Sequence, residues 1–371
     1  MSTIEINADA RARRVERVVA LGKRIADPAD PLGKEARRDL ESTSGLSREG
    51  VELALAEHLE VAITSVDRAA LLDAVEVAPR CHVILAANVC TAALRALALA
   101  LAASPIVTIR PSRRDPGLAP ILARELRIAV AEEITAAPGD ALHVYGSDAT
   151  IAAVRASAAP GVIVHGHGTG LGIAVVSAGI GIDIGIGIGI GIGIGLDAAA
   201  RALAADVIPF DQHGCLSPRF ALVEGDEARA TAFAAALHTA LGDLGARVPR
   251  GPLDEATSAA IALYGAAIDA VGMRFAGPHH VVGLDPSPRA LPLPPAARVV
   301  HVVPAHPSDA ARLLGQWARF VTTVGEAGPG ALLDAVLALA PEARQARLGR
   351  LQRPPLDGPV DRRGLGKSSR W

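Results

Sequence analysis

From residue 81 onward, short apolar runs alternate with longer segments in which apolar and polar residues recur at helical spacing. Such runs are typical of buried strands, and such segments are typical of helices. In chain order we predict a strand at 82–87, a helix at 91–103, a strand at 106–110, a helix at 117–134, a strand at 141–145, a helix at 148–156 and a strand at 161–165. Strict alternation predicts parallel strands joined by right-handed crossovers, hence an open α/β sheet.

The regions on either side of this sheet have their own patterns. Residues 10–75 are typical of helices with a solvated charged face, interrupted at 27–33 by two prolines and a glycine. Beyond residue 206 we predict a short strand at 207–210, helices at 227–245 and 254–271, and a second, smaller α/β pattern from residue 298 to 340. His279 and His280 follow a Gly-Pro pair, and we expect both at the surface.

Residues 179–195 form an almost unbroken alternation of isoleucine and glycine. This period is that of a strand, and glycine is too unfavourable in helices for the tract to be a good membrane span. We interpret it as an expanded repeat inserted between a strand that ends near Ser177 and a helix that begins near Leu196. An apolar tract with no proline and little charge is also an aggregation hazard.

Composition narrows the classes of protein and of partner. A chain of 371 residues that is 50% hydrophobic and 20% charged is long enough for two globular domains. With 2% aromatic residues and a net charge of -2, nothing favours nucleic-acid binding. Three cysteines give neither a disulfide framework nor paired metal-ligand spacing, and the N-terminus lacks the order of a signal peptide. We therefore expect a cytoplasmic protein with no metal and no membrane span.

Cys215 is the candidate for chemistry, because it follows an apolar run that breaks at 211–214 and lies on a turn beside Gly214. A substrate can reach a thiol in such a place, and the backbone amide of Cys215 can face an oxyanion formed on a carbonyl that the sulfur attacks. The alternative is a buried, inert cysteine.

Polar residues also follow three predicted strands, at the ends where ligands of parallel sheets bind. They are, in chain order, Asn88; Arg110, Ser112 and Arg113; and Gly146 with Ser147. The alternatives are a plain helix N-cap for Asn88 and a solvated cluster for the arginines. His165 and His167 lie two residues apart, but no third metal ligand is implied.

The stretch FDQHGCLSP at 210–218 resembles the cysteine loop of the acyl-CoA reductases to which the fatty-acid reductase of bacterial bioluminescence belongs, a branch of the aldehyde dehydrogenase superfamily. Three further stretches resemble this family in the same order, at 86–116, 144–151 and 351–361. The similarity thus runs from about residue 80 to the C-terminus.

The resemblance implies an α/β, aldehyde dehydrogenase-like fold with two domains, each built on an open, mostly parallel sheet with flanking helices. It divides the chain into a helical lead-in (1–80), a dinucleotide-binding domain (81–206), a catalytic cysteine domain (207–345) and a closing segment with a tail (346–371). It further implies a homo-oligomer that acts on an acyl-CoA substrate.

Individual residues gain roles from the same resemblance. Cys215 is implied as the nucleophile and Asn88 as a donor to the oxyanion. Arg110 stands where the superfamily usually has a lysine that contacts the adenosine ribose of the cofactor, and arginines there suit the 2′-phosphate of NADPH, with NADH as the alternative. The remaining cofactor contacts are implied for Ser112, Arg113, Gly146 and Ser147.

The predicted reaction is reduction of an acyl-CoA to an aldehyde through an acyl-cysteine. Residues 165–177 correspond to the segment in which hydrolytic aldehyde dehydrogenases carry a glutamate that activates water, and no carboxylate occurs there. This absence fits resolution of the acyl-cysteine by hydride or coenzyme A. Acyl-phosphate reduction, CoA-dependent aldehyde oxidation and a non-catalytic relative remain as alternatives.

We expect the Ile/Gly tract to be dispensable. Replacing residues 179–195 by a short polar turn should preserve reductase activity per folded molecule and improve solubility, because loop closure changes only logarithmically with length while an apolar strand edge promotes association. Activity assays and sedimentation of the shortened protein test this. Loss of cooperative unfolding would instead identify the tract as an integral strand.

Overall fold

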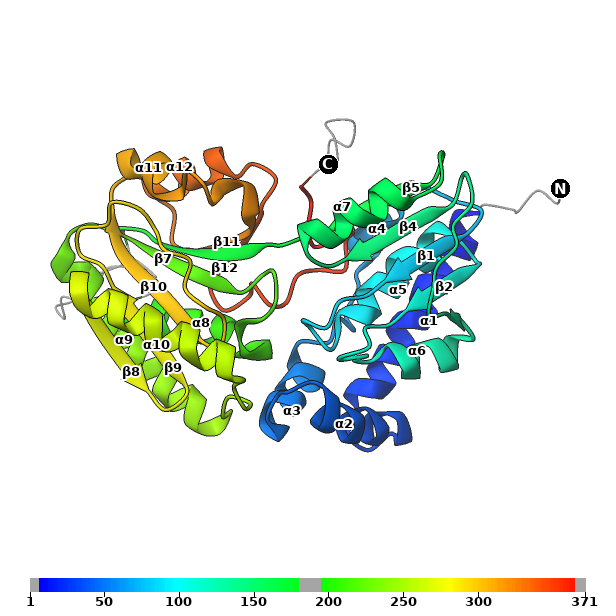
Figure 1. The fold of residues 1–371 in the computed structure, drawn as a ribbon, viewed down its shortest axis with the longest axis horizontal. Helices are drawn as coiled ribbons and strands as arrows, with labels where there is room; N and C mark the ends of the chain where they lie inside the picture. Colours follow the sequence, from blue (N-terminus) through cyan, green and yellow to red (C-terminus); the bar gives the residue numbers. More distant parts are fainter. Residues whose placement is uncertain (1–6, 180–194, 364–371) are drawn as a thin grey trace. The chain divides into compact units, whose positions relative to one another are not determined.

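The computed structural model describes residues 7–179 and 195–363, so the Ile/Gly tract predicted as an insertion lies outside the described residues except for its two end glycines. The chain forms two compact units, each with its own sheet (Figure 1). The first unit comprises Met1–Thr169 and Arg353–Trp371, and the second comprises Gly170–Gln352.

The first unit begins with helices, as predicted. They are α1 (Ala8–Ala26), α2 (Pro31–Thr43), α3 (Arg48–Glu57) and α4 (Ser65–Asp73). The predicted break at 27–33 is confirmed, because Asp30 caps α2 by accepting the Leu32 N–H at 2.9 Å and Pro31 occupies the first helical turn.

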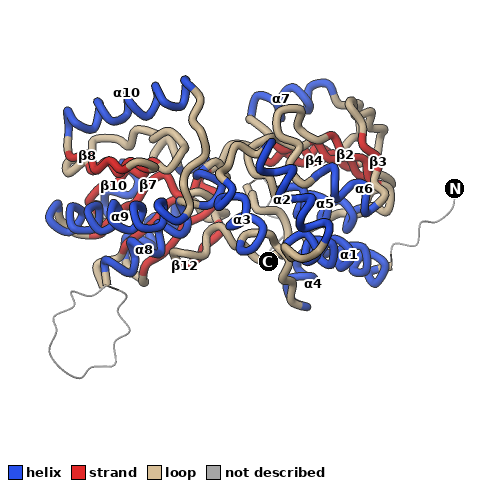
Figure 2. The backbone as a smooth tube through the Cα atoms, turned by 90° about the horizontal axis from the view of Figure 1, so that it is seen from below, coloured by secondary structure: helices blue, strands red, loops and turns tan. Residues whose placement is uncertain are grey.

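The sheet of the first unit has five parallel strands in the order β3-β2-β1-β4-β5. The strands are β1 (Cys81–Ile84), β2 (Val107–Arg110), β3 (Ala129–Val130), β4 (Ala141–Tyr145) and β5 (Ile163–His167). The helices between them are α5 (Ala92–Ala103), α6 (Ala119–Leu126) and α7 (Asp148–Ser157). Figure 2 shows α7 on one side of this sheet and α1, α5 and α6 on the other.

The strands predicted for this sheet are confirmed, but the helix predicted at 117–134 is too long. Helix α6 ends at Leu126, because Arg127 adopts a left-handed conformation with φ of 57°. The N–H of Arg127 donates to the carbonyls of Ala123 and Arg124 in the last helical turn. The next residues then add the short strand β3 to the edge of the sheet beside β2.

Buried Arg95 on α5 ties the end of the chain to the first unit. Its guanidinium pairs with Glu60 at 2.8 Å and donates to the carbonyls of Pro354 (3.2 Å), Pro355 (2.8 Å) and Gly358. Arg95 is only 5% exposed, so these acceptors replace the water that a cation loses on burial. The segment that follows Gln352 therefore belongs to the first unit.

The second unit contains a seven-stranded sheet in the order β12-β11-β6-β7-β10-β9-β8, in which only the β8–β9 pair is antiparallel among the strands described. The strands are β6 (Leu171–Val176), β7 (Pro218–Glu224), β8 (Met273–Gly277), β9 (His280–Leu284), β10 (Val299–Ala305), β11 (Val321–Ala327) and β12 (Arg344–Arg347). The α/β class with two mostly parallel sheets, expected from the resemblance, is thus confirmed.

Helices cover both faces of this sheet. They are α8 (Leu196–Val207), α9 (Glu227–Arg247), α10 (Glu255–Val271), α11 (Ala310–Leu314) and α12 (Ala331–Leu339), with 3₁₀ turns η1 (Pro209–Gln212), η2 (Pro307–Asp309) and η3 (Ala318–Phe320). Figure 1 shows α11 and α12 on one side of β7 and β10 and α8 and α9 on the other. Helices α11 and α12 close an apolar core that includes Ile173, Phe220 and Val324, each fully buried.

The structure corrects two local predictions around residue 206. Strand β6 pairs with β7 and β11, so β6 and α8 belong to the second unit, whereas the sequence placed them with the first sheet. The strand predicted at 207–210 is wrong: α8 continues to Val207, and the 3₁₀ turn η1 follows it. The apolar run at 207–210 is buried because it forms the end of α8 and the start of η1, which pack against the sheet.

Buried histidines are a further correction. His280, expected at the surface, is 1% exposed, and its Nε2 lies 2.9 Å from Nδ1 of His238 on α9. His301 on β10 is fully buried and hydrogen-bonded to the hydroxyl of Tyr264 at 2.9 Å. Burial lowers the pKa of both His280 and His301 to about 4.

These pKa values make the stability of the protein sensitive to acid. An unfolded histidine takes up a proton near pH 6.5, whereas His301 in the folded protein stays neutral until about pH 4. The free energy of unfolding should therefore fall as the pH drops from about 6.5 toward 4, by up to about 1.4 kcal/mol per pH unit for each such histidine. Urea unfolding at pH 7.5 and 5 measures this decrease.

The variant His301→Gln tests the contribution of this one group, because glutamine cannot be protonated here. Its acid-induced loss of stability should be smaller than that of the unmodified protein, whereas His306→Gln, at an exposed site, should leave the loss unchanged. An equal pH dependence in His301→Gln and the unmodified protein would contradict the depressed pKa.

Candidate active site

The polar residues predicted to follow three strands of the first sheet do come to one edge. Strand β1 lies between β2 and β4, and Ile84 at its end pairs with Arg110 of β2 and Val144 of β4. The carboxyl ends of these strands therefore lie side by side, with Asn88 after β1. This is the edge at which open α/β sheets bind ligands.

Asn88 is not the N-cap of the helix that follows it, which was the alternative to a role in the site. The N-cap of α5 is Thr91, and the exposed side chain of Asn88 makes no hydrogen bond within the described residues. The N-cap interpretation of Asn88 is therefore wrong, and its amide faces solvent in the first unit.

The loop after β2 presents guanidinium groups. Ser112 shapes it, since its hydroxyl accepts the N–H groups of Arg114 (3.2 Å) and Asp115 (3.4 Å). The side chain of Arg113 is 87% exposed, and its contact with the equally exposed Glu132 is 3.7 Å long. A surface ion pair of this kind contributes little to stability, so Arg113 can leave Glu132 and bind another anion. Arg110, the last residue of β2, is half-buried.

The turn after β4 caps the helix that follows. Ser147 is the N-cap of α7, and its hydroxyl accepts the Thr150 N–H at 3.2 Å, while the Gly146 N–H donates to the carbonyl of His167 at 3.2 Å. Asp148 accepts the Thr169 N–H at 3.0 Å. Guanidiniums, hydroxyls and a helix N-terminus at one edge are the donor set that a phosphorylated cofactor needs.

The histidines of β4 and β5 stack on one another rather than converge on a common point. The rings of His143 and His165 lie 4.7 Å apart, and Nδ1 of His143 lies 3.1 Å from Nε2 of His167. Burial lowers the pKa of His167 to about 4 and that of His143 well below its usual value, so the rings are neutral. Across 7–179 and 195–363, no three His, Cys, Asp or Glu side chains are placed to hold a metal ion.

Cys215 differs from the other two cysteines in its exposure. All three lie in the described part of the chain and none forms a disulfide. Cys81 and Cys90 are buried, and burial raises the pKa of each thiol to about 12, so they stay protonated and inert. Cys215 is half-buried, on the loop between η1 and β7 in the second unit. The alternative of a buried, inert cysteine thus describes Cys81 and Cys90.

The loop that carries Cys215 begins with three left-handed residues. Phe210, Asp211 and Gln212 have φ of 55°, 49° and 66°, a conformation that costs a non-glycine residue roughly 1–2 kcal/mol. Such a run persists only where surrounding contacts hold it. Here the contacts come from the side chains of Asp211 and Gln212.

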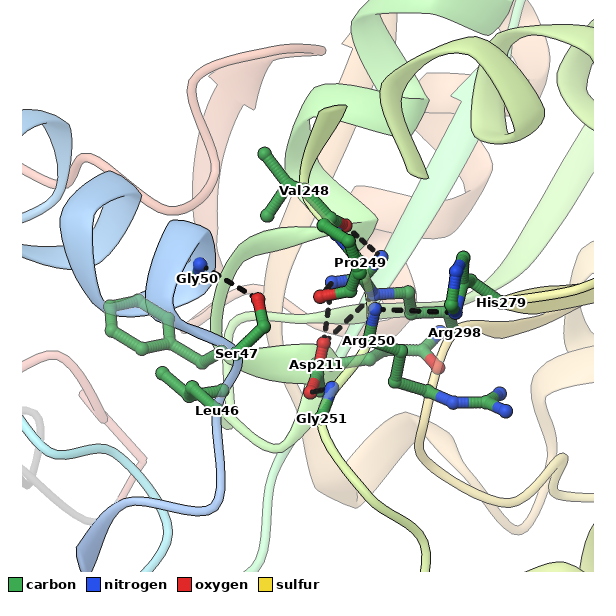
Figure 3. Close-up of polar contacts among 12 residues, drawn as sticks. Leu46, Ser47, Gly50, Asp211, Val248, Pro249, Arg250, Gly251, His279 and Arg298 are labelled. Carbon is green, nitrogen blue, oxygen red and sulfur yellow. Dashed lines mark hydrogen bonds and ion pairs between the residues drawn. The ribbon is translucent and has the colours of Figure 1, made fainter. Parts of the chain in front are cut away.

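Asp211 anchors the turn through a buried ion pair (Figure 3). Its Oδ1 accepts Nε of Arg298 at 2.8 Å, and its Oδ2 accepts the Gly251 N–H at 2.9 Å. Arg298 is 1% exposed and donates as well to the carbonyls of Val248 (2.7 Å) and Pro249 (3.3 Å). Both charges are thus paired and hydrogen-bonded, as burial requires.

Gln212 fastens the same turn to the sheet. Its Nε2 donates to the carbonyls of Pro218 (2.7 Å) and Val299 (2.8 Å), and its Oε1 accepts the Val299 N–H at 2.8 Å. One fully buried amide therefore joins the loop to the start of both β7 and β10. Sequence reasoning treated Asp211 and Gln212 only as strand breakers, because nothing local marks a polar residue as buried.

His213 lies two residues before Cys215 on the same loop. It is exposed, and its Nδ1 donates to the carbonyl of Phe210 at 3.1 Å. This bond closes the turn that begins at Phe210.

Comparisons with proteins of known structure identify the fold. An NAD-dependent benzaldehyde dehydrogenase from Corynebacterium glutamicum is similar over 92% of this chain and 80% of its own, with 18% identity and a TM-score of 0.65. Aldehyde dehydrogenase 21 from Physcomitrella patens, solved with the reaction product succinate, is similar over 95% of this chain and 79% of its own, with 15% identity and a TM-score of 0.66. At such identities the likeness establishes the aldehyde dehydrogenase-like fold.

No curated protein matches the chain. Within the described residues, every helix is either too short or too polar to cross a bilayer.

The family is identified by a model that covers nearly the whole sequence. The model described as acyl-CoA reductase (LuxC) matches residues 13–353, which include the cysteine loop and all three predicted strand-end sites. The chain therefore belongs to the acyl-CoA reductase (LuxC) family and is an oxidoreductase with the aldehyde dehydrogenase-like fold.

Proposed function

We propose that this protein reduces an acyl-CoA thioester to the aldehyde through an acyl-cysteine formed on Cys215, with a nicotinamide cofactor as reductant. The observation that carries the proposal is the contrast among the thiols: Cys215 is half-buried on a braced turn, whereas Cys81 and Cys90 are sealed in the core of the first unit. A nucleophile has to be both accessible and held in place.

The first half of the reaction transfers the acyl group. The thiolate of Cys215 attacks the thioester carbonyl carbon, the bond from that carbon to the sulfur of coenzyme A breaks, and coenzyme A leaves. The backbone N–H of Cys215 is the proposed donor to the oxyanion of the tetrahedral intermediate. Asn88 belongs to the other compact unit, and its role as a second donor remains a prediction.

The second half reduces the acyl-cysteine. A nicotinamide cofactor, when bound, would supply the hydride. The acyl carbon accepts it to give a thiohemiacetal, whose bond to the sulfur of Cys215 then breaks, so that the aldehyde leaves and the thiolate is restored. Arg110, Ser112, Arg113, Gly146 and Ser147 are the residues proposed to hold it, and their donors suit its phosphates. Residues 165–177 contain no carboxylate that would act as a base toward water, which supports reduction over hydrolysis.

Replacing the proposed nucleophile provides the direct test. Cys215→Ala should abolish acyl-CoA reduction while cofactor binding, measured by fluorescence titration, stays near that of the unmodified protein. Cys90→Ala is the matched control and should retain activity once its stability has been checked. Near-normal turnover by Cys215→Ala would refute the acyl-cysteine mechanism.

Cofactor preference tests the arginines after β2. A guanidinium–phosphate hydrogen bond contributes about 1.5–3 kcal/mol, so Arg113→Ala should raise KM for NADPH roughly tenfold or more and leave KM for NADH nearly unchanged. Arg38→Ala, which removes another exposed arginine paired with a carboxylate, should change neither value. Equal effects of Arg113→Ala on both cofactors would remove the case for 2′-phosphate recognition. Arg110→Ala, measured with both cofactors in the same way, shows whether this half-buried arginine also contributes to recognition of the 2′-phosphate.

A further inference from the structure

A β-bulge on strand β11 lies beside the loop that carries Cys215. Val321 pairs with Leu171 of β6 and Thr323 pairs with Gly172, so Thr322 is an extra residue in the ladder. A bulge changes the direction of a side chain and is common next to active sites. Here it turns the hydroxyl of Thr322 toward the cysteine loop.

The contacts of Thr322 are specific. Its Oγ1 donates to the backbone carbonyl of Cys215, and the carbonyl of Leu171 is a second acceptor at 3.2 Å. Thr322 is 2% exposed, so water does not compete for this hydrogen bond. The Cys215 carbonyl belongs to the peptide that links Cys215 to Leu216. Its direction therefore sets the backbone angle ψ of Cys215.

Two glycines allow the loop to approach so closely. A Cβ on Gly170 would lie 2.3 Å from Cγ2 of Thr322 and 3.1 Å from Cβ of Cys215. A Cβ on Gly172 would lie 2.5 Å from the carbonyl oxygen of Leu216. Any side chain at either position would push the cysteine loop or Thr322 away. The GLG sequence at 170–172 thus forms the floor on which the loop rests.

We propose that Thr322 is a positioning residue for Cys215, holding the peptide after the cysteine so that the thiol and the cysteine amide keep one orientation. Thr322 transfers no proton and acts only through Cys215. The proposal rests on the proposed nucleophilic role of Cys215, and it adds a residue from a strand more than a hundred positions away in the sequence. Gly170 is part of the same arrangement, because it leaves the space that Thr322 occupies.

Thr323 provides a matched control. It is the next residue on the same strand, is 1% exposed, and its hydroxyl also donates to a backbone carbonyl, that of Arg344 at 3.1 Å. Thr322→Val and Thr323→Val therefore remove the same kind of buried hydrogen bond from nearly the same place. Each should lower the midpoint of urea unfolding, because each removes a hydroxyl that donates to a backbone carbonyl.

Only Thr322→Val should change the chemistry of the thiol. We expect its rate of alkylation by iodoacetamide at Cys215, measured by mass spectrometry, to change at least fivefold. Its kcat should fall at least tenfold, with KM for the cofactor unchanged. Thr322→Ser, which keeps the hydroxyl, should restore both values. Thr322→Ala, which relieves any strain from the valine methyl groups, should behave like Thr322→Val and serves where that variant fails to fold.

Two results would overturn the proposal: an alkylation rate and kcat in Thr322→Ala equal to those of the unmodified protein, or equal losses in Thr323→Val. Failure of the proposed function is a separate outcome. If Cys215→Ala still reduces acyl-CoA, Cys215 is not the nucleophile, yet the alkylation rates still report whether Thr322 orients this thiol.

Discussion

The cysteine loop depends on one buried ion pair, between Asp211 and Arg298. Both side chains are almost completely removed from water, so each charge needs the other, and truncating one partner would leave the second unpaired at a cost of about 3–5 kcal/mol. The pair holds three left-handed residues in place, and these residues follow α8 and lead the chain into the cysteine loop. Gln212 then holds the start of the loop against β10, and Thr322 on β11 holds Cys215 within it.

Much of the fold follows from local pattern. Strand β4 has the predicted bounds, because an apolar run between turn residues carries its own signal. The strand predicted at 207–210 failed for the opposite reason. Four apolar residues fit a strand or a buried helix end equally well, and the left-handed turn that decides between them is held by Arg298, 87 residues away from Asp211.

The residues of the candidate site also fall into two groups, those that the sequence predicts and those that only the structure reveals. The residues after β1, β2 and β4 were predicted because parallel strands bring their carboxyl ends to a common edge. The supports of Cys215 were not, since Gln212, Thr322 and Gly170 become significant only when distant strands pair. His280 shows the same limit: it lies on β9 between β8 and β10 and contacts His238 on α9, whereas the Gly-Pro pair before it indicated only a turn.

The hydrogen bonds from Arg95 to residues 354–358 affect when the first unit can complete its folding during synthesis. The first unit opens the chain, but its buried guanidinium finds three of its acceptors some 260 residues later, after the whole second unit has been made. Until residues 354–358 have been synthesised, Glu60 is the only one of these partners that can pair with the cation. Domains usually mature from the N-terminus as they emerge, whereas here the earliest-made unit is completed last.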